Sequence, residues 1–102
     1  MMEEAGHGAE RVLRLPGRAT IREVSGLRDQ LLELLNQGDQ VVLDCSDVEQ
    51  SDLSLVQLII AVRRTTGGDE GLFRVILPPS GPVAEQIRYC GLEHEFTELW
   101  NG

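Results

Sequence analysis

The chain has 102 residues, of which 41% are hydrophobic and 25% charged, and its formal net charge is −8. This length and composition predict one soluble globular domain with a core of its own. The acidic balance argues against nucleic acid and anionic membranes as partners, and no apolar run approaches the ~20 residues of a membrane span. Residues 1–10 are expected to form a disordered tail in front of a domain at 11–102.

The two cysteines indicate the compartment. Cys45 and Cys90 do not form a Cys-x-x-Cys pair, and the acidic N-terminus lacks the features of a signal peptide. Reduced thiols are the rule in the cytoplasm, so we expect two buried, unpaired cysteines in a cytoplasmic protein, with a disulfide as the less favoured alternative.

The N-terminal third of the chain predicts a hairpin and a helix. Residues 11–15 alternate in polarity, as a strand does, and Pro16-Gly17 forms a turn signal. The segment RATI (18–21) is expected to return as a second, antiparallel strand. Apolar residues then recur at steps of three and four, which predicts an amphipathic helix over 22–38 ending at Gly38.

The rest of the chain repeats a strand-and-helix order. The apolar run at 40–45 is typical of a strand buried on both faces. After a polar turn, the continuous apolar residues from 55 to 62 predict a buried helix. A strand at 72–77 and a helix between Pro82 and Gly91 follow, and residues 93–100 are expected to cover one end of the core.

This order predicts an α/β fold with a mixed sheet. The N-terminal hairpin contributes antiparallel pairing, the later strand–helix–strand units contribute parallel pairing, and the helices lie mainly on one face. The periodicity predicts eight residues buried in one core between sheet and helices: Val12, Leu27, Leu31, Val42, Leu58, Val62, Val75 and Ile87.

Catalytic and metal sites have little support. His7 lies in the predicted tail, and Cys90 with His94 supplies only two of the four ligands that a structural zinc needs. The segment TTGGDEG (65–71) lacks the pattern of a phosphate-binding loop. We therefore expect no enzyme activity, no metal and no cofactor.

The polar turn before the second helix is the most distinctive segment. Seven polar residues fall within nine positions: Asp44, Ser46, Asp47, Glu49, Gln50, Ser51 and Asp52. Asp52 or Ser51 can cap the following helix, which is worth about 1 kcal/mol. A cap accounts for one or two of these residues, so two interpretations stand: a cap alone, or a cap within an interaction surface.

The segment VVLDCSDVEQSDLSLVQLIIAVRR, residues 41–64, resembles the central segment of STAS domains, the fold of anti-sigma-factor antagonists. Leu43-Asp44 matches the end of the family's strand, Val48 its valine and Asp52 the aspartate that opens its buried helix. The resemblance extends over about residues 11–98. It implies a STAS-like α/β domain that binds a partner protein.

The chain departs from the family pattern directly after this aspartate. The family places there the Ser or Thr that a partner kinase phosphorylates, whereas this chain has Leu53. The family's glycine is also replaced, by Leu55. The resemblance therefore implies an interaction surface that has lost its usual switch, with Ser54 and Ser51 as the remaining candidates for phosphorylation.

The resemblance implies a non-catalytic protein-interaction module in bacterial signalling, either antagonist-like or associated with chemotaxis or two-component systems. Its partner would be a sensor kinase, an anti-sigma kinase or an adaptor, bound through Ser51, Asp52, Leu53 and Ser54. One alternative is an antagonist switched through Ser54 or Ser51. Another is a small cytoplasmic subunit of a lipid-transport ATPase of the ABC class. Neither nucleic-acid binding nor membrane insertion is expected.

Overall fold

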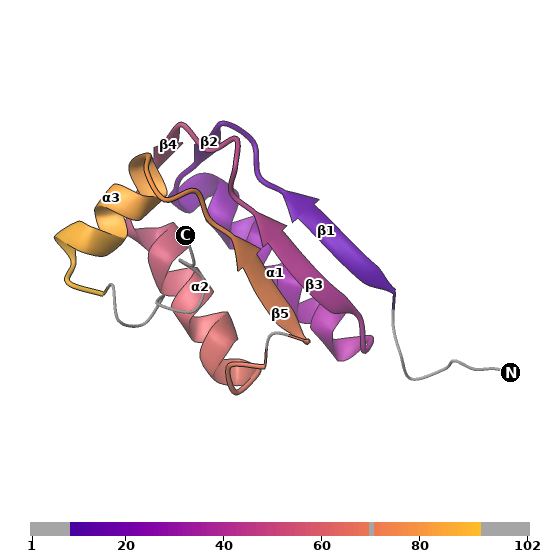
Figure 1. Cartoon of the computed structure of the whole chain (residues 1–102). Coiled ribbons are helices and arrows are strands. Elements are labelled where there is room, and N and C mark those ends of the chain that lie inside the picture. The colour runs from indigo at the N-terminus through magenta and orange to yellow at the C-terminus, as the bar shows by residue number, and fades with distance from the viewer. Residues whose placement is uncertain (1–8, 70, 93–102) are drawn as a thin grey trace, which may run out of the picture.

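The computed structural model describes residues 9–69 and 71–92 and has an α/β architecture (Figure 1). β1, β3 and β5 form a parallel sheet with β3 in the middle, and the short strands β2 and β4 form a separate parallel pair. The elements in chain order are β1 (Glu10–Arg14), β2 (Arg18–Ala19), α1 (Ile21–Asn36), β3 (Gln40–Asp44), β4 (Gln50–Ser51), α2 (Leu53–Thr65), β5 (Phe73–Ile76) and α3 (Pro82–Tyr89).

The predicted α/β class is confirmed, and so are the predicted elements in their order and the glycines that end two helices. The structure adds one short strand, β4, inside the segment that was predicted to be a polar turn. Gly38 and Gly91 follow the last residues of α1 and α3 with φ of 84° and 69°. This left-handed backbone is the usual helix end for glycine. β1 begins at Glu10, the last residue of the predicted tail. Residues 1–8, and the segment 93–100 that we expected to cover the core, lie outside the described residues.

The predicted N-terminal hairpin is wrong, and all pairing among the described strands is parallel. Beyond β1 the chain continues along β3, because the Leu15 amide donates to the Asp44 carbonyl at 2.9 Å. Pro16 has no N–H and cannot extend this ladder. The Gly17 carbonyl then accepts the amides of Glu49 and Gln50, at 2.7 and 2.9 Å, which places β2 beside β4 and not beside β1.

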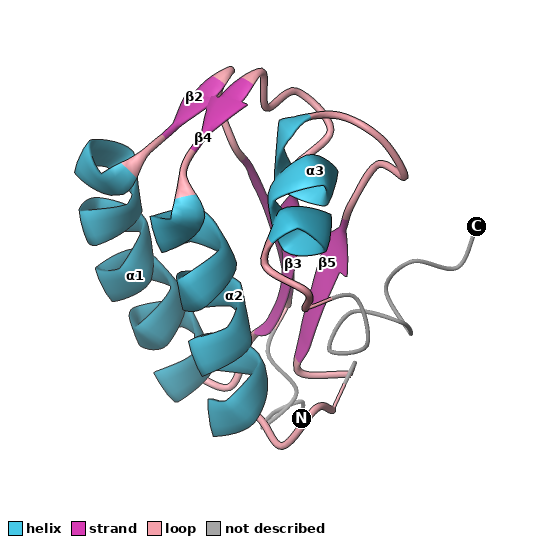
Figure 2. Cartoon of the chain, turned by 90° about the vertical axis from the view of Figure 1, so that its left-hand side faces the viewer, coloured by secondary structure: helices cyan, strands magenta, loops and turns pink. Residues whose placement is uncertain are grey.

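The helices lie on one side of the sheet, as predicted. Figure 2 shows α1 and α2 side by side, with α3 next to the upper part of α2. The strands show the corresponding alternation: in β5, Phe73 and Val75 are buried, whereas Arg74 and Ile76 are exposed. Side chains on a strand alternate between faces, so the exposed pair marks the face opposite the helices.

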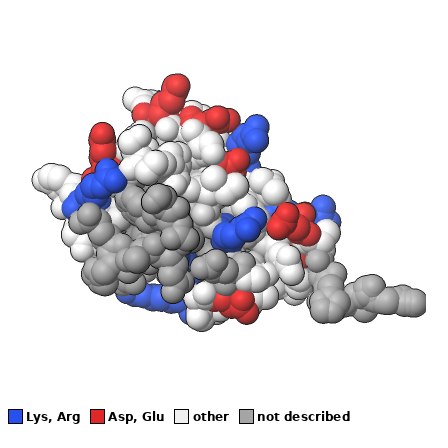
Figure 3. Space-filling model, viewed as in Figure 1, with Lys and Arg blue, Asp and Glu red and all other residues white. Residues whose placement is uncertain are grey.

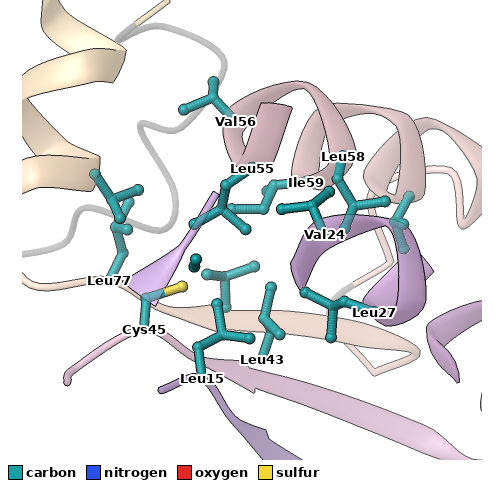
Figure 4. Packing of buried hydrophobic residues seen from close by; sticks show 14 of the residues in the cluster. Leu15, Val24, Leu27, Leu43, Cys45, Leu55, Val56, Leu58, Ile59 and Leu77 are labelled. Carbon is teal, nitrogen blue, oxygen red and sulfur yellow. The ribbon is translucent and has the colours of Figure 1, made fainter. Parts of the chain in front are cut away.

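Buried apolar side chains from the sheet and the helices form one cluster (Figure 4). Six of the eight predicted core residues belong to it: Leu27, Leu31, Leu58, Val62, Val75 and Ile87. Val12 was predicted wrongly and is 55% exposed. Val42, its partner across the strands, is buried but lies outside the cluster. Both valines share the face of Arg74, which is exposed.

The two cysteines are free, which confirms the prediction of unpaired thiols. Cys45 belongs to the buried cluster, and this burial, with a smaller contribution from the neighbouring Asp44 carboxylate, raises the pKa of its thiol to about 12. The predicted burial of Cys90 is wrong: this residue directly follows α3 and is exposed. Only the thiolate is nucleophilic, so the two residues differ sharply in expected reactivity.

We therefore expect iodoacetamide at pH 8 to alkylate Cys90 in the native protein and to leave Cys45 unmodified. In denaturant, where burial no longer suppresses ionisation, both thiols should react. Peptide mapping by mass spectrometry checks this. Native alkylation of Cys45 at a rate close to that of Cys90 would contradict the placement of Cys45 in the core.

Candidate partner-binding site

The short pair β2–β4 brings the beginnings of two helices to one end of the molecule. β2 leads into α1 and β4 leads into α2, and the two strands run parallel in the register Arg18–Gln50 and Ala19–Ser51. Figure 2 shows both helices starting just below this strand pair. The free N–H groups of two helix N-termini therefore face the same end of the fold.

Asp52 connects these two helices through both of its carboxylate oxygens. Oδ1 accepts the Ser54 amide at 3.0 Å and also the Ser54 hydroxyl, as an N-cap of α2. Oδ2 accepts the amide of Ile21, the first residue of α1, at 3.0 Å. One side chain thus caps its own helix and a helix that begins 31 residues earlier in the chain.

These hydrogen bonds determine the charge state of Asp52. They lower the pKa of the carboxyl below its ordinary value of 3.8, with the Ser54 hydroxyl as the largest contributor and the amides of Ile21 and Ser54 adding to it. Hydrogen bonds donated to a carboxylate favour its ionised form. Asp52 is therefore negatively charged at neutral pH, in contact with the positive ends of two helix dipoles.

The first turn of α1 has a second carboxylate. Glu23 accepts the amide and the hydroxyl of Thr20, at 2.9 and 2.8 Å through its Oε1. The Thr20 amide, followed by the Thr20 hydroxyl, lowers the pKa of Glu23. The start of α1 is thus held locally by Glu23 and from α2 by Asp52.

Asp44 and Ser46 have a structural role at the other end of the polar turn. Asp44 is buried at the end of β3, and its Oδ1 accepts the amide and the hydroxyl of Ser46 at 2.9 and 2.6 Å. The Ser46 hydroxyl is the main cause of the lowered pKa of Asp44, and the Arg14 guanidinium at 3.5 Å contributes. Part of the polarity of this segment therefore serves the turn itself.

The four residues predicted from the sequence differ in accessibility. Leu53 projects outward and is 42% exposed. The hydroxyl of Ser54 is bonded to Asp52, and the hydroxyl of Ser51 is buried without a hydrogen-bond partner. Asp52 is partly exposed, with both oxygens used inside the protein. Leu53 is therefore the residue of this set that offers a free surface.

Two large apolar side chains that the sequence reasoning missed lie at this end. Ile21, whose amide contacts Asp52, is 64% exposed. Tyr89, at the end of α3, is 93% exposed and lines a hollow together with Leu53. Ile21 fell within a predicted strand and Tyr89 within a predicted helix, and no local pattern in the sequence links either to Leu53.

The described part of the chain has neither a cluster of metal ligands nor a helix that could span a membrane. Within residues 9–69 and 71–92 no group of three or more His, Cys, Asp or Glu residues is arranged to hold a metal ion. None of the helices described there is long and apolar enough to cross a bilayer. His7 and His94 lie outside the described residues.

A family model described as "Mlab, STAS domain" matches residues 2–99, which is nearly the whole chain. Comparison with curated proteins gives no match. The helix–sheet layers and the helix that follows Asp52 agree with the fold of this family, whose domains generally act as binding modules. The chain belongs to the STAS domain family.

Proposed function

We propose that the protein is a non-catalytic interaction module of a bacterial cytoplasmic signalling system, and that it binds its partner protein at the start of α2. The observation that carries this proposal is Leu53: a leucine exposed at the first position of α2, directly after the helix-capping Asp52. Its position corresponds to the one at which the family's usual partner kinase acts.

The surroundings of Leu53 support a protein partner. Ile21 and Tyr89 add two further large exposed side chains at the same end of the molecule. The partly exposed Asp52 and Ser54, whose polar groups are bonded to each other, add polar surface around Leu53. An apolar centre with a polar rim is the usual composition of a protein–protein interface.

The hydroxyl geometry supports binding without a phosphorylation switch. Phosphate on Ser54 would add nearly two negative charges beside the Asp52 carboxylate that now accepts its hydroxyl. Phosphate on Ser51 would require a hydroxyl that is buried to become accessible to a kinase. The Ser54 hydroxyl is bonded to Asp52 and the Ser51 hydroxyl is buried, so we propose a constitutive binding surface.

Because Asp52 caps both α1 and α2, a substitution at Leu53 tests the site better than one at Asp52. An Asp52 substitution disturbs the starts of two helices, so a loss of binding would not separate recognition from folding. Leu53 makes an exposed surface without that structural role. Leu72, 41% exposed before β5, matches it in residue type and exposure. Leu53 is the first residue of α2, and Leu72 directly precedes β5. The beginnings of α2 and β5 lie at opposite ends of the fold (Figure 1).

We expect affinity capture from native cytosol to recover a protein with wild type and with Leu72→Glu as bait, and to lose it with Leu53→Glu. A charge placed at the centre of an apolar contact should weaken binding by more than tenfold, or about 1.4 kcal/mol. Quantitative mass spectrometry of the retained proteins measures the loss. Retention of the same proteins by Leu53→Glu would place the partner surface elsewhere.

The identity of the captured protein separates the alternatives. A sensor kinase or adaptor supports the proposal. An anti-sigma kinase indicates an antagonist. Phosphate on Ser54 or Ser51 in the recovered chain would then favour the alternative of an antagonist that is switched by phosphorylation. An ATPase indicates a transport subunit that uses the same surface.

A further inference from the structure

Leu53 and Tyr89 enclose a small hollow between the start of α2 and the end of α3. Its volume is about 230 Å³, and its lining consists of Leu53, Gln86, Tyr89 and Cys90. Sites for small-molecule ligands usually measure roughly 300–1,000 Å³. The hollow is thus too small for most such ligands and suits one large side chain of another protein.

Gln86, one of the residues that line this hollow, has a polar atom without a partner. Gln86 donates from Nε2 to the Ser51 carbonyl at 2.9 Å, which fixes its side chain across β4. Its Oε1 is buried and has no hydrogen-bond partner, and the hydroxyl of Ser51 is in the same condition. Buried polar atoms are nearly always paired, so Gln86 Oε1 would gain a missing hydrogen bond if its side chain turned toward a donor in the hollow.

Tyr89 is unusually exposed for an aromatic residue. It is the most exposed of the large apolar side chains in the described part of the chain, at 93%, and it is the last residue of α3. Tyrosine is enriched among the few residues that dominate binding energy, because it offers a rigid apolar ring and a polar tip. This position fits an anchor for a partner better than it fits a role in the fold.

The charge of the molecule selects among partners. The chain has 17 acidic and 9 basic residues. Figure 3 shows acidic side chains over β2 and β4 at the top of the molecule, and Asp47 and Glu49 are the exposed acidic residues leading into β4. Like charges oppose association with a second copy, whereas a basic partner is attracted.

From these observations we infer that the hollow between Leu53 and Tyr89 receives an apolar side chain from a basic segment of the partner protein, and that an N–H or O–H of that segment donates to Gln86 Oε1. This inference rests on the proposed function and adds the chemistry of the partner. Tyr89 is the anchor on α3 and Leu53 the anchor on α2, so the partner contacts both helices.

The test uses the full chain and peptides of defined sequence. Short random peptides displayed on phage are selected against the protein, and the enriched sequences are synthesised. We expect them to share a large apolar residue with Lys or Arg nearby. Their affinity should fall at least about tenfold with Tyr89→Ala and with Leu53→Ala, and stay unchanged with Leu72→Ala.

Cys90 reports directly on occupancy of the hollow. It lines the hollow and is exposed, whereas Cys45 is buried with a thiol pKa of about 12. A bound peptide should slow alkylation of Cys90 in proportion to the fraction of chain occupied. Alkylation of Cys45 measures unfolding of each variant, so a Tyr89 variant that fails to fold is recognised at once.

Three outcomes would overturn the inference: enriched peptides without basic residues, binding that survives Tyr89→Ala in a folded variant, or unchanged alkylation of Cys90. In the absence of peptide, protection of Cys90 should not increase as the protein concentration rises. Such an increase would show that a second copy of the chain, and not a basic segment of a partner, occupies the hollow. If Leu53→Glu abolishes capture of the native partner while Tyr89→Ala does not, the proposed function stands and only this hollow is rejected.

Discussion

Leu55→Ala is expected to destabilise the protein by about 3 kcal/mol. Replacing a buried leucine by alanine leaves a cavity and costs roughly 2–5 kcal/mol. Leu55 has no exposed surface and lies among the core residues where α2 meets the sheet. Small domains have a total stability of about 5–15 kcal/mol, so this single change removes a large part of it. Urea denaturation followed by circular dichroism measures the difference.

Leu53→Ala is the matched control, because it makes the same change two residues earlier on the same helix. Leu53 is substantially exposed, so the free energy of unfolding should change by no more than about 0.5 kcal/mol. Alanine is also the better helix former, which excludes a propensity effect as the cause of any loss. Equal destabilisation by the two variants would mean that α2 buries a different face.

Asp52→Ala is expected to cost about 2 kcal/mol, at the upper end of the range for one helix cap, because the carboxylate caps α2 and α1 together. Asp52→Asn should cost less than Asp52→Ala, because the asparagine carbonyl oxygen can still accept one of the two amides. It should cost more than nothing, because the other amide loses its acceptor. The expected order of stability is wild type, then asparagine, then alanine, measured by urea denaturation. An asparagine variant as stable as wild type would show that the Asp52–Ile21 contact contributes nothing.

The contribution of Asp52 should disappear in acid. Its pKa in the folded protein lies below the ordinary value of 3.8, because the ionised form accepts the Ser54 hydroxyl and the two amides. A lowered pKa stabilises the folded state at all pH values above that ordinary value, and the benefit is lost as pH falls through the folded pKa. The stability difference between wild type and Asp52→Ala should therefore shrink below about pH 4. A difference independent of pH would contradict the ionised cap.

The helices of this protein follow from local patterns in the sequence. The apolar run from 55 to 62 and the capping position of Asp52 predicted α2, and the glycines at 38 and 91 marked the ends of α1 and α3. Such signals depend on backbone geometry within a few residues, so they can be read without knowing the rest of the fold. The resemblance to STAS domains, confirmed by the family match, came from the same segments.

Strand pairing was not determined in this way. Pro16-Gly17 is compatible with a reversal and with a simple end of pairing, and the hydrogen bonds from Glu49 and Gln50 to Gly17 decided for the second. Val12 and Leu13 are both apolar neighbours on β1, so alternation alone could not say which one faces the helices. Only the position of α1 and α2 on one side of the sheet made Leu13 the residue that packs against the core.

The sequence by itself determined the STAS family, the helices and the polar turn with Asp52 and Leu53 at its end. Only the tertiary structure decided what surrounds them. Ile21 and Gln86 lie 31 and 35 residues from their partners Asp52 and Ser51, and Tyr89 comes to Leu53 from the end of the last described helix. These contacts arise because α1, α2 and α3 pack together on one sheet, and a pattern of neighbouring residues carries no information about such distant packing.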